Sequence, residues 1–522
     1  REFIRESSKS GIDIFRIFDS LNWLKGIEVS LDEVLSCGKI AEVALCYTGD
    51  ILDTNRDKYS LQYYVNKAKE IEKMGAHILA IKDMSALLKP YSARKLIKAL
   101  KNEISIPIHL HTHDTTGTGV ATVLMAAEAG VDIVDTTFNG MSGLTSQPAL
   151  NSIVAALENT DRDTGIDLND IQKLSDYWDG IRPIYSKFES GLKSGSAEIY
   201  KYEIPGGQYS NLRPQVESFG LGHRFKEVKL MYKRVNEMVG DIIKVTPSSK
   251  MVGDMAIFMV QNDLTPENVY NKAKNMAFPD SVVSYFKGMM GQPEGGFPKD
   301  LQKLVLKGEK PIDVRPGELL KDEDFQGIKG HINKRFSIKA TNRDAISYAL
   351  YPDVYEEYLK FLQEFGNVSR IRSDVFLHGL AEGEVSEIDL GEGKTIIVKL
   401  VQIGNIDLDG YRNVDFEING YRRSIRIKDR TQTVRSVLGE DSKFRMADSN
   451  NKSDVGASIP GNIIKILVKK GERVEEGQSL AVIEAMKMET NIVATIEGII
   501  EAVYVSEGQQ VKTGELLMKI SN

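Results

Sequence analysis

Short apolar runs rich in β-branched residues recur through the first part of the chain and alternate with longer amphipathic stretches. The stretches "YSLQYYVNKAKEIEKMG" and "SARKLIKALKN" carry apolar residues at helical spacing. Strand-like runs about 25 to 35 residues apart, with a helix between them, are typical of βα units in a parallel sheet. The expected strands are Ile12–Phe18, Ile40–Thr48, His77–Asp83, Ile106–Asp114 and Val131–Thr137.

These units predict an α/β barrel of the TIM type, with about five βα units in residues 1–213. Residues 214–364 are helix-rich with glycine and proline breaks. Strand character returns in residues 365–445, in "KTIIVKLVQIG", "RNVDFEING" and "YRRSIRIKD", which predicts an α+β domain. Residues 446–458 are polar and small, so we expect a flexible linker there.

Residues 459–522 contain an internal repeat with a shift of 37 residues. Gly461 then falls on Gly498, and Ile463 falls on Ile500. Each half reads as short β-branched strands separated by glycine turns, "GNIIKILVKKGERVEEGQ" and "GIIEAVYVSEGQQVKTGE". Two such halves predict an all-β, flattened and pseudo-symmetric barrel.

Lys487 stands in "EAMKMET", almost midway between Gly477 and Gly498, which predicts a place on the tight turn joining the two halves. A lysine on a protruding hairpin is a good attachment point for a swinging cofactor, because it is exposed and carried on a flexible stem. A lone lysine would be read as a solvated surface residue. The repeat, the midpoint and the flanking methionines together favour attachment.

Composition narrows the possible partners. With 41% hydrophobic and 27% charged residues the chain reads as ordinary and globular, and its length indicates three or four domains. The net charge of −7 indicates neither nucleic-acid binding nor an anionic membrane surface. Cys37 and Cys46 lie in or near an apolar run, which favours a reducing cytoplasm over disulfides. No apolar run reaches membrane-spanning length.

"HLHTHD" carries the sharpest local signal. His109, His111 and His113 alternate, so on a strand all three point to one face, and the last two can converge on one divalent metal. The preceding strand ends in "AIKDM", which places Lys82 inside the barrel or at its rim. A buried lysine must be neutralised or paired. Carbamylation by CO2 would make it an anionic metal ligand, and an ion pair with Asp83 or another carboxylate is the alternative.

Thr145 lies in the loop "NGMSGLTSQPAL" after the last expected strand, at the barrel mouth. A hydroxyl there could relay a proton. A lone threonine in such a loop is more often a cap or turn residue, and the sequence leaves both readings open.

Several motifs together resemble the carboxyltransferase domain of pyruvate carboxylases, and "AMKM" resembles a biotin carboxyl carrier domain. The motifs run in order through the chain: "GIDIFRIFDSLN", "YTGD", "IKDM", "HTHDTTG", "MSGLTSQP", "YEIPGGQYSNL", "MVGDMAIFMVQNDLT", "SVVSYFKGMMGQPEGGFP" and "YPDVYEEY". Residues 214–364 would then extend the barrel as a helical funnel, and residues 365–445 would be the allosteric tetramerisation domain. The last domain, residues 459–522, would carry biotin.

The resemblance implies a set of functional residues. Lys82, as a carbamate, would bind Zn2+ or Mn2+ with His111 and His113. Thr145 would shuttle a proton between pyruvate and biotin, and Lys487 would carry biotin attached by biotin protein ligase. Carboxyl transfer from carboxybiotin to the enolate of pyruvate would then give oxaloacetate in a cytoplasmic homotetramer.

The resemblance also implies parts that these residues do not contain. Only five expected strands precede "EIPGGQY", whereas such a barrel has eight, so Arg1 is expected to start partway through it. An upstream domain would use Mg-ATP and bicarbonate, and acetyl-CoA would be an allosteric activator. Some bacterial relatives bind cyclic di-AMP on tyrosines, for which Tyr64 and Tyr91 are candidates here; partly buried helix tyrosines are the alternative.

Two other functions compete with this interpretation. The α-subunit of an oxaloacetate decarboxylase sodium pump has the same two modules and would work in reverse with membrane partners. "EIPGGQYSNL" and the strand-rich segment before the linker favour the carboxylase. A non-catalytic scaffold that carries biotin is the third possibility, and the intact "HTHD", "IKDM" and "MSGLTSQP" set speaks against it.

Overall fold

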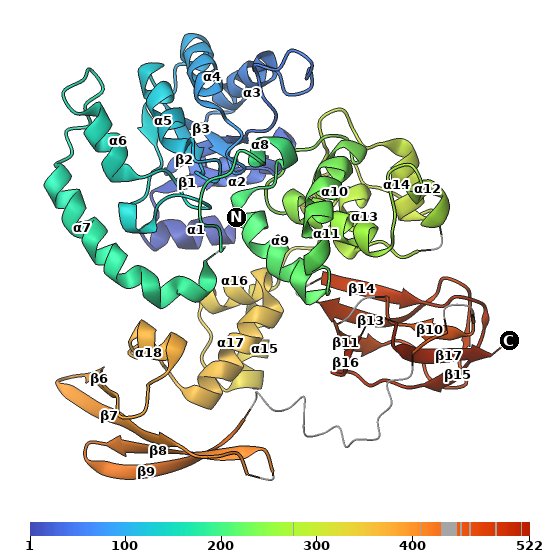
Figure 1. Ribbon diagram of the computed structural model, residues 1–522. Coiled ribbons are helices and arrows are strands. Elements are labelled where there is room, and N and C mark those ends of the chain that lie inside the picture. Colours follow the sequence, from blue (N-terminus) through green and yellow to red (C-terminus); the bar gives the residue numbers. More distant parts are fainter. Residues whose placement is uncertain are drawn as a thin grey trace. The chain divides into compact units, whose positions relative to one another are not determined.

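Five parallel strands lie side by side in chain order in the N-terminal part of the computed structural model (Figure 1). Each strand pairs with its neighbours along the chain, as successive βα units require. They are β1 (Ile14–Ile17), β2 (Ile40–Cys46), β3 (Ile78–Asp83), β4 (Ile108–Thr112) and β5 (Ile133–Val134). The five expected strands are confirmed, and each is shorter than its apolar run.

Helices cover one face of this sheet. Val43, Leu79 and Leu110 point to that face and pack in one apolar core with the helices. Residues that alternate with them point to the other face, which is where Glu42, Lys82 and His111 lie. The helices are α1 (Glu2–Lys9), α2 (Leu24–Ser36), α3 (Leu61–Lys73), α4 (Pro90–Glu103) and α5 (Gly119–Glu128).

A helical segment follows the sheet and surrounds α11, in which all residues from Met251 to Val260 are buried. A helix that is buried all round needs partners on every side, and the core around it draws on α9, α10, α13 and α14. The helices are α6 (Leu150–Leu157), α7 (Leu168–Ile181), α8 (Ile199–Tyr202), α9 (Gly206–Ser218), α10 (Phe225–Met238), α11 (Ser248–Gln261), α12 (Val269–Lys272), α13 (Asp280–Lys287) and α14 (Lys299–Leu306).

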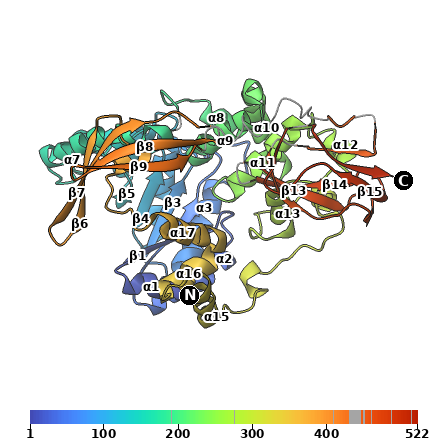
Figure 2. The same ribbon diagram turned by 90° about the horizontal axis from the view of Figure 1, so that it is seen from below.

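A second compact unit comprises Pro183–Lys187 and Glu323–Phe444. Its helices pack around Ile332, Phe336 and Leu359, and its four strands form an antiparallel sheet in chain order (Figure 2). Strands β7, β8 and β9 match the three expected runs, whereas β6 was not expected. The elements are α15 (Phe325–Phe336), α16 (Asn342–Leu350), α17 (Pro352–Phe365), α18 (Ser373–His378), β6 (Val385–Gly391), β7 (Lys394–Ile403), β8 (Tyr411–Ile418) and β9 (Tyr421–Lys428).

The C-terminal domain consists of two four-stranded sheets, and its two halves repeat each other in space as in sequence. A Cβ added to Gly461 would lie 2.4 Å from the backbone oxygen of Glu484, and one added to Gly498 would lie 2.3 Å from that of Ser521. Each pair is shifted by 37 residues from the other, so the pseudo-symmetric β-fold is confirmed. Its strands are β10 (Asp454–Gly456), β11 (Gly461–Ile466), β12 (Arg473–Val474), β13 (Ser479–Ala485), β14 (Met488–Val493), β15 (Gly498–Val503), β16 (Gln510–Val511) and β17 (Leu516–Ser521).

Part of the expected linker belongs to this domain, because β10 pairs with β17. The backbone N–H of Ala457 also donates to the Glu515 carbonyl at 2.8 Å. The other domain boundaries expected from the sequence stay a prediction. The structure describes residues 1–189, 191–274, 276–407, 409–429, 446–448, 451–458, 461–485, 488–512 and 514–521.

Candidate active site

The carboxyl ends of β3 and β4 bring the expected metal ligands together on the face of the sheet opposite the helices. Lys82 lies beside His111 in the parallel register, and His113 follows two residues later. The imidazole rings of His111 and His113 meet edge to face, with centroids 5.2 Å apart and planes at 80°. The strand alternation that the sequence predicted therefore groups these three side chains at one place.

His113 is buried, and one of its ring nitrogens has no partner. Its Nδ1 donates a hydrogen bond to the backbone oxygen of Thr145 at 2.6 Å. Its Nε2 makes no hydrogen bond to any described residue. Burial outweighs the Thr145 hydrogen bond and lowers the pKa of His113 to about 4, so the ring is neutral at pH 7. A neutral imidazole with a free lone pair is the form that binds metal ions.

His111 is held in the same tautomer by a different acceptor. Its Nδ1 donates to Oδ2 of Asp135 at 2.7 Å, and within the described residues no hydrogen bond to its Nε2 is found. Metal-binding histidines generally donate their second ring N–H to a carboxylate or a backbone carbonyl in this way. Both histidines thus present Nε2 as the free nitrogen.

Lys82 is half-buried, and its amine makes no ion pair or hydrogen bond with the described residues. It lies over the ring of Phe18, with Nζ 4.8 Å from the ring centroid. Burial lowers the pKa of the amine, and the nearby Arg16 lowers it further. The alternative pairing with Asp83 is wrong, because Asp83 points to the other face and accepts the backbone N–H groups of Leu87 and Leu88, each at 2.9 Å.

These residues fit a divalent metal ion. The described ranges contain no group of three or more His, Cys, Asp and Glu side chains arranged to hold one. The available donors are the two imidazole nitrogens and the Lys82 amine, or the carbamate that CO2 forms on it. The buried, unpartnered Nε2 of His113 is the observation that indicates a missing ligand. Nitrogen and carboxylate-like donors suit Zn2+ and Mn2+ alike.

A charged network that includes His109, the first histidine of the motif, was not predicted as part of the site. His109 places Nε2 2.8 Å from Asp135 and Nδ1 3.1 Å from Glu42. Arg16 bonds to Glu42 through Nε, and its second guanidinium nitrogen lies 2.8 Å from Asp135. Although burial opposes it, the hydrogen bonds that His109 donates to Asp135 and Glu42 raise its pKa to about 9. The only sequence signals were the third alternating histidine and a carboxylate at the end of "VDIVD".

Thr145 contacts the site through its backbone rather than through its hydroxyl. The carbonyl of Thr145 accepts the His113 hydrogen bond, while the residue itself is half-buried. A Cβ on Gly206, the first residue of α9, would lie 3.3 Å from Cα of Thr145 and 3.0 Å from Oγ1 of Thr115. A glycine there lets α9 begin close against the loop. The proton relay assigned to Thr145 stays a prediction.

The two tyrosines expected for cyclic di-AMP differ in exposure. Tyr64 is fully buried, and its hydroxyl donates to the backbone oxygen of Thr48 at 2.9 Å. Its ring packs on Tyr47 and Tyr63, so it has no free face for a ligand, and the expectation for Tyr64 is corrected. Tyr91 is 71% exposed, and its role stays a prediction.

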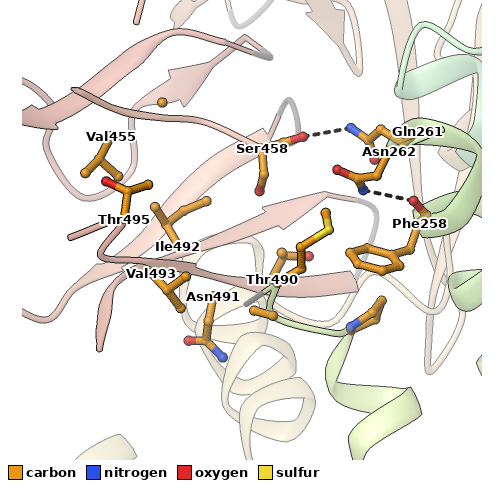
Figure 3. Close-up of a pocket in the computed structure, with 14 residues that line it drawn as sticks. Phe258, Gln261, Asn262, Val455, Ser458, Thr490, Asn491, Ile492, Val493 and Thr495 are labelled. Carbon is orange, nitrogen blue, oxygen red and sulfur yellow. Dashed lines mark hydrogen bonds between the residues drawn. The ribbon is translucent and has the colours of Figure 1, made fainter. Parts of the chain in front are cut away.

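The hairpin that would carry a cofactor is formed by β13 and β14, which pair as far as Ala485 and Met488. Lys487 is one of the two residues that join these strands, and it lies outside the described residues. Strand β14 and α11 line a cavity of about 210 Å³, beside which Gln261 Nε2 donates to the backbone oxygen of Ser458 at 2.9 Å (Figure 3).

Three family descriptions match consecutive parts of the chain. Residues 53–177 match "HMGL-like", residues 199–399 match "Conserved carboxylase domain", and residues 451–520 match "Biotin-requiring enzyme". The carboxyl transferase domain of Rhizobium etli pyruvate carboxylase is 47% identical, with a TM-score of 0.78 over 82% of this chain and 72% of that chain. The chain belongs to the pyruvate carboxylase family.

Curated members of this family match over the whole chain. Pyruvate carboxylase of Bacillus subtilis is 51% identical over 520 residues, and the mitochondrial pyruvate carboxylase of Homo sapiens is 40% identical over 522 residues. The chain spans 45% and 44% of the lengths of these two relatives. The five-stranded sheet is accordingly part of a TIM-type barrel, and the C-terminal domain is of the biotinyl type. Among the described helices, none is both long and apolar enough to cross a membrane.

Proposed function

We propose that this chain performs the carboxyl transfer from biotin to pyruvate that yields oxaloacetate, and that its last domain carries the biotin. The observation that carries the proposal is the group formed by Lys82, His111 and His113, with a buried ring nitrogen left without a partner. The group stands in a chain that is 51% identical to a pyruvate carboxylase over its whole length. A related carboxyl transferase domain has been solved with pyruvate and biocytin.

His111 and His113 would hold Zn2+ or Mn2+ through Nε2, together with Lys82. The bound ion would supply Lewis-acid polarisation of a carbonyl oxygen. The residues themselves prepare this site: Asp135 and the Thr145 carbonyl keep Nδ1 protonated on both rings. Burial favours the neutral form of the Lys82 amine, which is the form that reacts with CO2 to give a carbamate.

Thr145 is proposed to relay the proton between the methyl group of pyruvate and biotin through its hydroxyl. Its contact with His113 uses the carbonyl, which every substitution at this position retains. A change of the hydroxyl alone can therefore be tested without removing the support of His113.

Lys487 is proposed to carry biotin, attached by biotin protein ligase. The matching of residues 451–520 to biotin-requiring enzymes supports this, as does the position of Lys487 between the paired ends of β13 and β14. Biotin would move a carboxyl group between two sites. The family resemblance supports four further proposals: homotetramer formation, activation by acetyl-CoA, the use of Mg-ATP and bicarbonate by a further domain, and cyclic di-AMP binding near Tyr91.

The testing experiment measures oxaloacetate formation by the intact natural protein from pyruvate, bicarbonate and Mg-ATP, with and without avidin. We expect product that depends on ATP and is blocked by avidin. Lys487→Arg should abolish both the product and streptavidin-detected biotin, whereas Lys469→Arg, at an exposed lysine of the same domain, should change neither. Consumption of oxaloacetate without any effect of ATP would refute the proposal.

A further inference from the structure

Asp135 accepts hydrogen bonds from three different side chains. His111 donates to it through Nδ1 at 2.7 Å, and Nε2 of His109 lies 2.8 Å away. Arg16 completes the set, with a guanidinium nitrogen 2.8 Å from Oδ2. Three donors leave little freedom for the carboxylate, and the proposed metal ligand His111 is one of them.

The donors come from widely separated elements. Arg16 is on β1 at one edge of the sheet, the two histidines are on β4, and Asp135 directly follows β5 at the other edge. Arg16 is itself tied to Glu42, which also lies 3.1 Å from His109. The Asp135 carboxylate is thus fixed by residues from both edges of the sheet, on the face opposite the helices, rather than by its own strand alone.

We infer that Asp135 is a positioning residue for the metal, which holds the His111 ring with Nε2 free and correctly aimed, while Arg16 and His109 hold Asp135. This inference rests on the proposed function, since it concerns the same site. Carboxylates that bind the second ring nitrogen of a metal-ligating histidine fix its tautomer and orientation and make it a better donor. His113 is held by a backbone carbonyl instead, which no substitution removes. Of the two acceptors, only the Asp135 carboxylate can therefore be changed by a single substitution.

The expected magnitude follows from this role. Removing the outer partner of a metal-bound histidine typically weakens metal affinity by about ten- to a hundredfold. Asp135→Asn keeps the volume of the side chain and removes its charge. It should therefore weaken binding by about this factor without removing any of the direct ligands.

The test uses the intact natural protein, stripped of metal and titrated with Zn2+ against a chromogenic chelator and with Mn2+ by electron paramagnetic resonance. The Asp135→Asn variant should bind the ion that the wild type binds at least tenfold more weakly. Asp132→Asn is the matched control, because Asp132 pairs with Lys101 and accepts the backbone N–H of Ile108 but touches neither histidine. Its affinity should stay within twofold of the wild type.

A double variant separates positioning from a general loss of structure. If Asp135 acts through His111, then adding Asp135→Asn to His111→Ala should change the remaining affinity by less than twofold. An equal loss in both backgrounds overturns the inference, and so does an Asp135→Asn protein that binds as tightly as the wild type. A wild type that binds neither ion overturns both the inference and the proposed metal site.

Discussion

Glu203 forms a buried ion pair with Lys244, and replacing Glu203 should destabilise the part of the helical segment around this pair. Its Oε2 lies 2.8 Å from Nζ of Lys244, whose side chain is 1% exposed, and its Oε1 lies 2.7 Å from Arg56. Glu203→Gln would leave the Lys244 ammonium buried without its counter-charge. Breaking a buried pair in this way usually costs about 3 to 5 kcal/mol.

The pKa of Glu203 gives an independent magnitude. Burial raises it, but Lys244 and then Arg56 outweigh burial and lower it from 4.5 to about 2. A fall of that size corresponds to roughly 3 kcal/mol of stabilisation of the charged form. Because the folded pKa is below the unfolded one, this stabilisation is present above about pH 4.5 and is lost as the pH falls toward 2.

The assay is amide hydrogen exchange of peptides that cover residues 199–206 and 240–252, since a chain of several domains does not unfold in one step. At pH 7 the opening free energy should fall by about 3 kcal/mol in Glu203→Gln, and the difference from wild type should shrink at pH 3. Glu198→Gln is the control, because its 2.6 Å pair with Lys229 is solvent-exposed on the glutamate side, and it should cost under about 1 kcal/mol.

A neutral replacement of the whole pair sharpens the test. The double variant Glu203→Gln with Lys244→Met removes the uncompensated charge, and it should recover most of the loss. If Glu203→Gln is as mild as Glu198→Gln, or if the double variant is worse than the single one, the reasoning from burial and charge is refuted.

Other expectations follow from single contacts. Gly461→Ala and Gly498→Ala should each destabilise the C-terminal domain in thermal melts, because both added Cβ atoms meet a backbone oxygen; Gly207→Ala, whose added Cβ meets nothing within 4 Å, should not. Thr145→Val should retain the wild-type metal content by elemental analysis, since the carbonyl remains, but lose carboxylation of pyruvate at least tenfold. Tyr91→Ala should weaken cyclic di-AMP binding in calorimetry, and an unchanged affinity would exclude Tyr91 from that role.

The sequence predicted the elements that repeat with a regular period. Strands such as Ile40–Cys46 were recognisable because their apolar runs are buried by neighbours on both sides. The run Val131–Thr137 predicts a strand of seven residues, whereas β5 is Ile133–Val134, since an edge strand has a pairing partner on one side only. The 37-residue repeat could also be recognised from the sequence, because Gly461 and Gly498 pack against equivalent backbone positions in their two halves.

The residues that sequence reasoning missed depend on contacts between distant segments. The helical period alone did not show that Tyr64 is buried, because its neighbour Tyr63 on α3 is only partly buried. The pairing of Glu203 with Lys244 gave no signal either. Glu203 lies in the motif "YEIPGGQYSNL", but nothing in the motif points to Lys244, which lies 41 residues further along the chain. The proposed metal ligands could be named from the sequence because Lys82, His111 and His113 lie on or just after neighbouring strands, where alternation and register place them.

One ion pair shows why Asp135 could not be found in the same way. Arg16 lies on one edge strand of a five-stranded sheet and Asp135 follows the other, and in a flat sheet those edges would be about 19 Å apart. An arginine and an aspartate cannot bridge that distance, yet their side chains lie 2.8 Å apart. The sheet must therefore curl strongly, as a barrel does, and bring its edges toward each other across the concave face. Only this curvature lets a carboxylate after β5 bind an arginine of β1 and a histidine of β4 at once, so the support of His111 is a property of the barrel rather than of any one strand.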